Sequence, residues 1–130
     1  MALERIFKNL VLVEFSLFVF IIFAVIFESE EITTISEGLS SGILDNDFGM
    51  LITIAFLFIY LVDLFLLYRF VNIGKTLFLI LFIGGIFLTL FSGPNVSGSR
   101  VYILDWLEGV TNGALLVFLY FTPIKDKFAK

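Results

Sequence analysis

Four acidic side chains stand within or just inside long apolar stretches of the sequence. They are Glu14, Asp63, Asp105 and Glu108. A carboxylate in apolar surroundings is costly, so such acids usually pair, hold a proton or line a polar path. These residues are therefore the first candidates for chemistry, which would be proton binding, cation binding or hydrogen bonding between helices.

Glu14 and Asp63 are the strongest candidates of the four. At a helical rise of 1.5 Å per residue, Glu14 lies about 12 Å inside the stretch that starts at Ile6, and Asp63 about 10 Å inside the stretch that ends at Phe70. Similar depth on neighbouring helices predicts that the two acids can meet. Neither acid has a basic residue three or four positions away, and desolvation together with like charge favours a protonated carboxyl group.

Two roles fit this pair of acids. One is a proton or ion site, and the other is a neutral hydrogen-bonding clamp between helices. Tyr60 lies on the same side of its helix as Asp63 and is a candidate hydrogen-bond partner in either role. Lys75, at the start of the next stretch, is either an anchor at the membrane surface or a cation that reaches Asp63.

Small and polar residues in the last two apolar stretches predict contacts with other helices. In the last stretch a period of 100° per residue places five of them on one sector: Asp105, Glu108, Gly109, Asn112 and Gly113. Gly85 and Thr89 form a similar edge in the preceding stretch. Small residues four apart let helix backbones approach closely, so both sets are candidate interface seams. A plain packing seam with two acids near the membrane surface is the alternative for the last stretch.

Four apolar stretches must position these residues, at about 6–27, 50–70, 73–91 and 101–121. Each has about the 20 residues that a helix needs to cross a bilayer. Sixty per cent of the 130 residues are hydrophobic and 15% are charged. The sequence therefore predicts an all-α integral membrane protein, with one domain over 1–130 and four transmembrane helices in an antiparallel up-down bundle. The acidic segment 28–47 carries apolar residues at helical spacing, which indicates a short amphipathic helix.

The basic residues predict the orientation of the chain. With four crossings, seven of them fall on one side: Arg5, Lys8, Arg69, Lys75, Lys125, Lys127 and Lys130. Only Arg100 falls on the other side. Because lysine and arginine are enriched in cytoplasmic segments, both termini are predicted to be cytoplasmic, and short loops favour a bacterial inner membrane.

The absence of cysteine and histidine from the sequence narrows the function classes. Thiol chemistry, imidazole metal sites and a Ser/His/Asp arrangement are excluded, so we expect no enzymatic activity, no cofactor and no metal site. The expected partners are the lipid bilayer and either other membrane subunits or further copies of the chain, and no nucleic acid. The leading interpretation is a non-enzymatic subunit or accessory protein that binds membrane helices. The alternative is a small oligomeric proton-coupled transporter or channel that uses Glu14 and Asp63.

Overall fold

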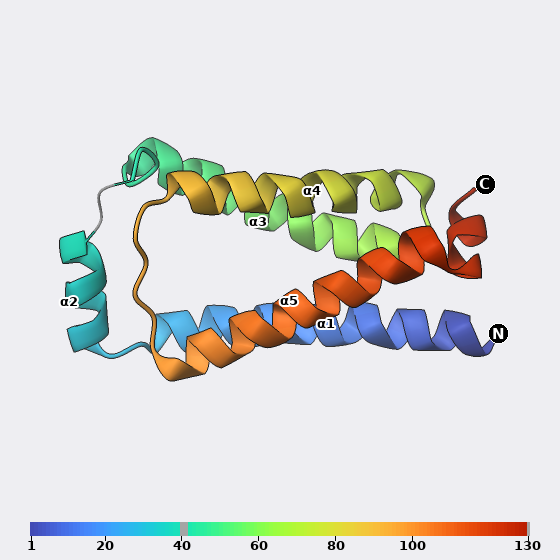
Figure 1. The fold of residues 1–130 in the computed structure, drawn as a ribbon, viewed down its shortest axis with the longest axis horizontal. Helices are drawn as coiled ribbons and strands as arrows, with labels where there is room; N and C mark the ends of the chain where they lie inside the picture. The colour runs from blue at the N-terminus through green and yellow to red at the C-terminus, as the bar shows by residue number, and fades with distance from the viewer. Residues whose placement is uncertain (40–41, 130) are drawn as a thin grey trace.

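The computed structural model describes residues 1–39 and 42–129, and its regular elements within these ranges are all helical. The elements are α1 (Ala2–Ile26), α2 (Glu30–Leu39), α3 (Asp47–Tyr68), α4 (Asn72–Phe91), α5 (Ser99–Phe121) and a 3-10 helix, η1 (Pro123–Phe128). Figure 1 shows the four long helices side by side, with both termini at one end of the molecule and α2 at the other. We call these the terminal end and the loop end.

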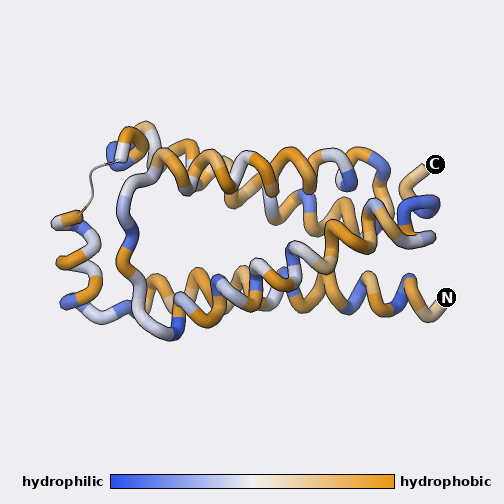
Figure 2. The backbone as a smooth tube through the Cα atoms, viewed as in Figure 1, coloured by the Kyte–Doolittle hydropathy of each residue, from blue (hydrophilic) through white to orange (hydrophobic). Residues whose placement is uncertain are grey.

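The four long helices cover the four predicted apolar stretches, and each is long and apolar enough to cross a membrane. In Figure 2 they are mostly hydrophobic along their length, and hydrophilic residues gather toward both ends. Helix α1 begins earlier than its apolar stretch because residues 2–5 are all good helix formers, and two of them, Glu4 and Arg5, are charged and were left out of the stretch. Helix α2 lies in the segment predicted to be amphipathic.

Helix α1 packs mainly against α5, and α3 mainly against α4. The buried apolar side chains come from the start of α1, the end of α3, the start of α4, the end of α5 and η1, so the core occupies the terminal half of the bundle. Its members are Phe7, Val11, Phe18, Tyr60, Leu64, Leu67, Phe78, Leu81, Leu115, Leu119, Ile124 and Phe128.

Toward the loop end, large apolar side chains are left uncovered. Phe58 of α3 is 66% exposed, Phe87 of α4 55% and Trp106 of α5 65%. A continuous apolar surface of this kind is unfavourable in water and is typical of helices that face lipid or a partner. Large apolar side chains are exposed at the terminal end as well, among them Phe65, Ile73 and Phe121.

Three aromatic rings close the terminal end. The ring centroid of Phe128 in η1 lies 5.9 Å from that of Phe7 and 5.3 Å from that of Phe70. Phe70 adopts a positive φ of 56° in the turn after α3, where its N–H and that of Val71 donate to carbonyls in the last turn of α3. This is the hydrogen-bond pattern of a Schellman cap, which usually contains glycine. The segment after α5, which carries Lys125 and Lys127, therefore folds back as η1 and completes the core.

Candidate binding site

Glu14 belongs to a buried hydrogen-bond network, centred on Tyr60, that joins three helices. Its side chain, on α1, is completely buried. The hydroxyl of Tyr60 on α3 contacts the Oε1 atom of Glu14 and also lies 3.0 Å from the Oδ1 atom of Asn112 on α5. Phe18, one turn along α1, packs its ring 5.6 Å from the Tyr60 ring and holds the tyrosine in place.

The network has two consistent proton arrangements, because one hydroxyl has one proton to donate. If Glu14 is protonated, it donates to the Tyr60 oxygen and Tyr60 donates to the Oδ1 atom of Asn112. If Glu14 is ionised, Tyr60 donates to the carboxylate and the amide of Asn112 turns so that its NH2 group donates to Tyr60. The three side chains can therefore accommodate Glu14 with or without its proton while every bond between them is kept.

Glu108 adds a second carboxyl group to this network. It is half-buried on α5, one turn before Asn112, and lines the cavity beside the network, close enough to Glu14 for the two carboxyl groups to interact electrostatically. Two carboxylates that lie close together repel each other, so a shared proton or a bound cation would stabilise the pair. Within residues 1–39 and 42–129, the ion pairs are those of Glu4 with Lys8 and Lys127, and neither involves Glu14 or Glu108.

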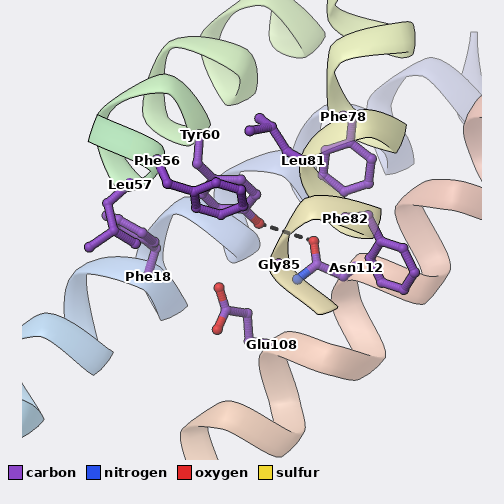
Figure 3. A pocket seen from close by; sticks show the side chains of 10 residues that line it. All are labelled: Phe18, Phe56, Leu57, Tyr60, Phe78, Leu81, Phe82, Gly85, Glu108 and Asn112. Carbon is purple, nitrogen blue, oxygen red and sulfur yellow. Dashed lines mark hydrogen bonds between the residues drawn. The ribbon is translucent and has the colours of Figure 1, made fainter. Parts of the chain in front are cut away.

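A cavity of about 190 Å³ lies next to this network, and all four long helices contribute to its wall. Figure 3 shows the carboxyl group of Glu108 and the amide of Asn112 directed toward the space below the Tyr60 ring. The rest of the wall is apolar and largely aromatic: Phe18, Phe56, Leu57, Phe78, Leu81, Phe82 and Gly85. The cavity is therefore an apolar chamber with one acidic side.

Asp63 is completely buried in a separate position, one turn beyond Tyr60 on α3. Neither of its carboxyl oxygens has a hydrogen-bond partner among the described residues, so the predicted meeting with Glu14 is not formed as a hydrogen bond. Lys75 does not form an ion pair with Asp63 in the described part of the chain either. Its ammonium nitrogen lies 4.6 Å from the centre of the Tyr120 ring, and the Tyr120 hydroxyl donates to the Lys75 carbonyl at 2.9 Å.

The five residues of the predicted α5 seam do not act together. Glu108 and Asn112 face the interior, whereas Asp105 and Gly109 are exposed. A methyl group added at Gly109 or Gly113 would meet no atom within 4 Å outside its own helix, so this glycine pair makes no close helix contact within the chain. The division arises because five residues spread over about 140° of α5, which is more than one neighbouring helix covers.

The two residues of the predicted α4 edge, Gly85 and Thr89, also lie in different surroundings. Gly85 lines the cavity, where a methyl group at its Cα would lie 3.7 Å from the Phe56 ring. Thr89 is exposed and its hydroxyl donates to the Gly85 carbonyl within the same helix, at 2.9 Å. Gly85 therefore belongs to the candidate site, and Thr89 contacts no other helix through its hydroxyl.

The aromatic wall is the part of the site that the sequence analysis missed. A signal for it exists, because each long helix places two site residues four positions apart and hence on one face. The pairs are Glu14 and Phe18, Phe56 and Tyr60, Phe78 and Phe82, and Glu108 and Asn112. In a chain with 18 phenylalanines such spacing is common, so the structure was needed to show which pairs converge.

Comparison of the chain with protein-family models, curated proteins and solved structures finds no match.

Proposed function

We propose that this protein is a small, non-enzymatic integral membrane protein that binds protons or small cations at Glu14 and Glu108, as a carrier or channel. The observation that supports this most directly is the completely buried Glu14 carboxyl group, which has hydrogen-bonding groups around it and a cavity beside it but no basic partner in the described residues. Intramembrane acids of this kind commonly mark ion or proton pathways.

The two proton arrangements of Glu14, Tyr60 and Asn112 support this function. A clamp with a purely structural role needs only one of these proton arrangements. A carrier must both bind and release its ion, so its two states must have similar free energies. Rotation of the Asn112 amide preserves the hydrogen bonds in both states. Because a single four-helix bundle is narrow, a complete path across the membrane would be formed by two or more copies.

We place the protein across a bacterial inner membrane as an antiparallel up-down bundle, with both termini in the cytoplasm. Arg5, Lys8, Arg69, Lys75, Lys125 and Lys127 support this orientation, because all six belong to the terminal end (Figure 1), and Lys130 lies outside the described residues. Lysine and arginine concentrate on the cytoplasmic side of membrane proteins. A reporter fused after the last residue is therefore expected to be active in the cytoplasm, and one inserted at Gly38 of α2 outside. The opposite pattern would contradict this orientation.

Titration of Glu14 tests the proposed function. In lipid vesicles, the infrared carbonyl band of protonated carboxyl groups is expected to change between about pH 5 and about pH 9, as an exchanging buried acid requires. Glu14→Gln should remove the part of this band that belongs to the buried group, and Tyr60→Phe should shift it, because the hydroxyl contact is lost.

Glu37→Gln is the matched control for this titration, since Glu37 is an exposed residue of α2. It should leave unchanged the part of the carbonyl band that belongs to the buried carboxyl group. If the difference between the bands of the wild type and Glu14→Gln stays the same from about pH 5 to about pH 9, Glu14 does not exchange its proton in this range, and the network is a structural clamp.

A second candidate function, binding of another membrane helix, is favoured by the exposed side of α5. Tyr102, Asp105, Trp106, Gly109 and Val110 line a shallow hollow there, and the space next to Gly109 is open. An exposed carboxylate on a spanning helix is unfavourable in lipid, so a partner that covers Asp105 would stabilise the protein. This agrees with the interpretation of the chain as a subunit or accessory protein.

Substitution at Gly109 tests helix binding through this hollow. Gly109→Leu is expected to leave the fold and thermal stability of the isolated chain nearly unchanged, because a Cβ atom at this position meets no atom of another helix within 4 Å. It should reduce association, with further copies or with co-purified membrane proteins, about tenfold, because close helix approach is blocked. Light scattering and co-purification measure the effect.

Ala55→Leu, on an exposed position of α3, is the matched control for this small-to-large change. It should not affect association. Equal association of Gly109→Leu and wild type would show that the hollow is not an interface.

A further inference from the structure

The cavity next to Glu14 combines aromatic walls with an acidic side. Five of its lining residues are aromatic: Phe18, Phe56, Tyr60, Phe78 and Phe82. Glu108 lines the cavity directly, and Glu14 lies behind it, against the Tyr60 hydroxyl. The described residues of the wall include no lysine or arginine. The cavity therefore offers carboxyl groups and aromatic rings to whatever enters it.

We propose that this cavity binds the methylated ammonium group of a small organic cation. The proposal deepens the proposed function, on which it rests, by naming the substrate class. Aromatic rings attract a cation through their quadrupoles, and several rings around a quaternary ammonium group form a well-known type of binding site. Methyl groups on the nitrogen would contact the Phe rings, while the charge would be balanced by Glu108 and Glu14.

The alternatives fit the cavity less well. An anion would be repelled by the two carboxyl groups. A divalent metal ion needs several oxygen ligands in place of its water shell, and residues 1–39 and 42–129 gather no group of three or more Asp, Glu, His or Cys side chains that could hold one. A drug-sized cation would not fit either, since sites for such ligands have about 300 to 1,000 Å³ and this cavity has about 190 Å³.

The methylated ammonium group has two possible sources, a free amine and the choline headgroup of a phospholipid. Both present the same chemistry to the rings and the carboxylates. The lipid in which the protein is embedded separates them, because phosphatidylglycerol carries no ammonium group and phosphatidylcholine carries one on every headgroup.

The test uses the full chain in phosphatidylglycerol nanodiscs and tetramethylammonium as the probe. Saturation-transfer NMR detects its methyl protons in the bound state, and calorimetry measures affinity, with sodium chloride as the ionic-strength control. We expect saturable binding to the wild type. Glu108→Gln should weaken it about tenfold, and Gly85→Leu, which places a side chain in the cavity, should abolish it.

Further variants keep the test decisive if Gly85→Leu does not fold. Phe82→Leu retains apolar volume but removes one ring, and should weaken binding about threefold or more. Glu37→Gln on α2 should bind as the wild type does. Unchanged affinity in both Glu108→Gln and Phe82→Leu would show that tetramethylammonium binds elsewhere and would overturn the proposal.

Size and source are tested with two more measurements. Tetraphenylphosphonium, a much larger cation, should not compete with tetramethylammonium, and tight competition would contradict the size argument.

In phosphatidylcholine nanodiscs, weaker apparent binding identifies the lipid headgroup as an occupant, and unchanged binding identifies a free amine; both agree with the site. If tetramethylammonium does not bind at all while the Glu14 carboxyl band still titrates, this inference is wrong and the proposed proton site remains.

Discussion

Asp63→Leu is expected to raise the stability of the protein by about 1 to 3 kcal/mol, the usual cost of leaving a buried polar group without a partner. Asp63 is completely buried, and neither of its carboxyl oxygens has a hydrogen-bond partner in the described structure. An apolar side chain of similar length removes that cost and adds contacts to the core around Leu64 and Leu67. Denaturation in detergent, followed by circular dichroism, measures the change.

Glu14→Leu is the matched control, and the opposite sign is expected. Here the Oε1 atom of the carboxyl group contacts the Tyr60 hydroxyl, so removal of the carboxyl group costs that hydroxyl one of its two hydrogen-bond partners, at about 1 to 3 kcal/mol. Had the two acids formed one hydrogen-bonded pair, as their similar depth suggested, both substitutions would destabilise the protein. A loss of stability in Asp63→Leu as large as that in Glu14→Leu would therefore contradict the unpaired state of Asp63.

Phe128→Ala is expected to destabilise the protein by about 3 to 5 kcal/mol, the range for removing a buried phenylalanine ring. The ring of Phe128 is 1% exposed and packs edge-on against Phe7 and Phe70. Without it, η1 loses its main anchor and the turn at Phe70 loses a contact that offsets its positive φ. The denaturation midpoint measures the loss, and proteolysis after Lys125 or Lys127 should become faster.

Lys127→Ala is the control for this prediction, because it changes η1 without opening the core. Its ammonium group lies 3.6 Å from Glu4, and both side chains are partly exposed. Ion pairs of this kind contribute at most about 1 kcal/mol. If Phe128→Ala costs no more than Lys127→Ala, then η1 does not close the terminal end, and the basic segment behaves as the simple tail that its composition suggests.

The partner of each buried acid could not be predicted from the sequence. Glu14 and Tyr60 are 46 residues apart, and Tyr60 and Asn112 are 52 apart. Depth along the helices placed Glu14 near Asp63, but depth leaves rotation about the helix axis undetermined. Because α5 packs on α1, Asn112 joins Glu14 through the Tyr60 hydroxyl and Glu108 lies nearby, whereas Asp63, one turn beyond Tyr60, has no hydrogen-bond partner in the described structure.

The surroundings of the polar sector of α5 also could not be predicted from the sequence. Its helical period correctly indicated that the sector is distinct from the apolar face, yet Glu108 and Asn112 turn inward while Asp105 and Gly109 stay exposed. A helix period assigns residues to a face, but it does not say where the neighbouring helix ends. The aromatic wall was missed for a related reason, since phenylalanine is favourable both against lipid and in a core.

What the sequence determined by itself is local: four helices of spanning length, an amphipathic α2, and a concentration of basic residues toward one end. Length and hydropathy are properties of continuous segments, and an apolar segment of about 20 residues satisfies its backbone hydrogen bonds best as a helix. The tertiary structure alone decided which acids share a network, where the cavity lies, and that Phe128 folds back on Phe7. These depend on the rotation and crossing of helices, which arise from contacts between residues far apart in the chain.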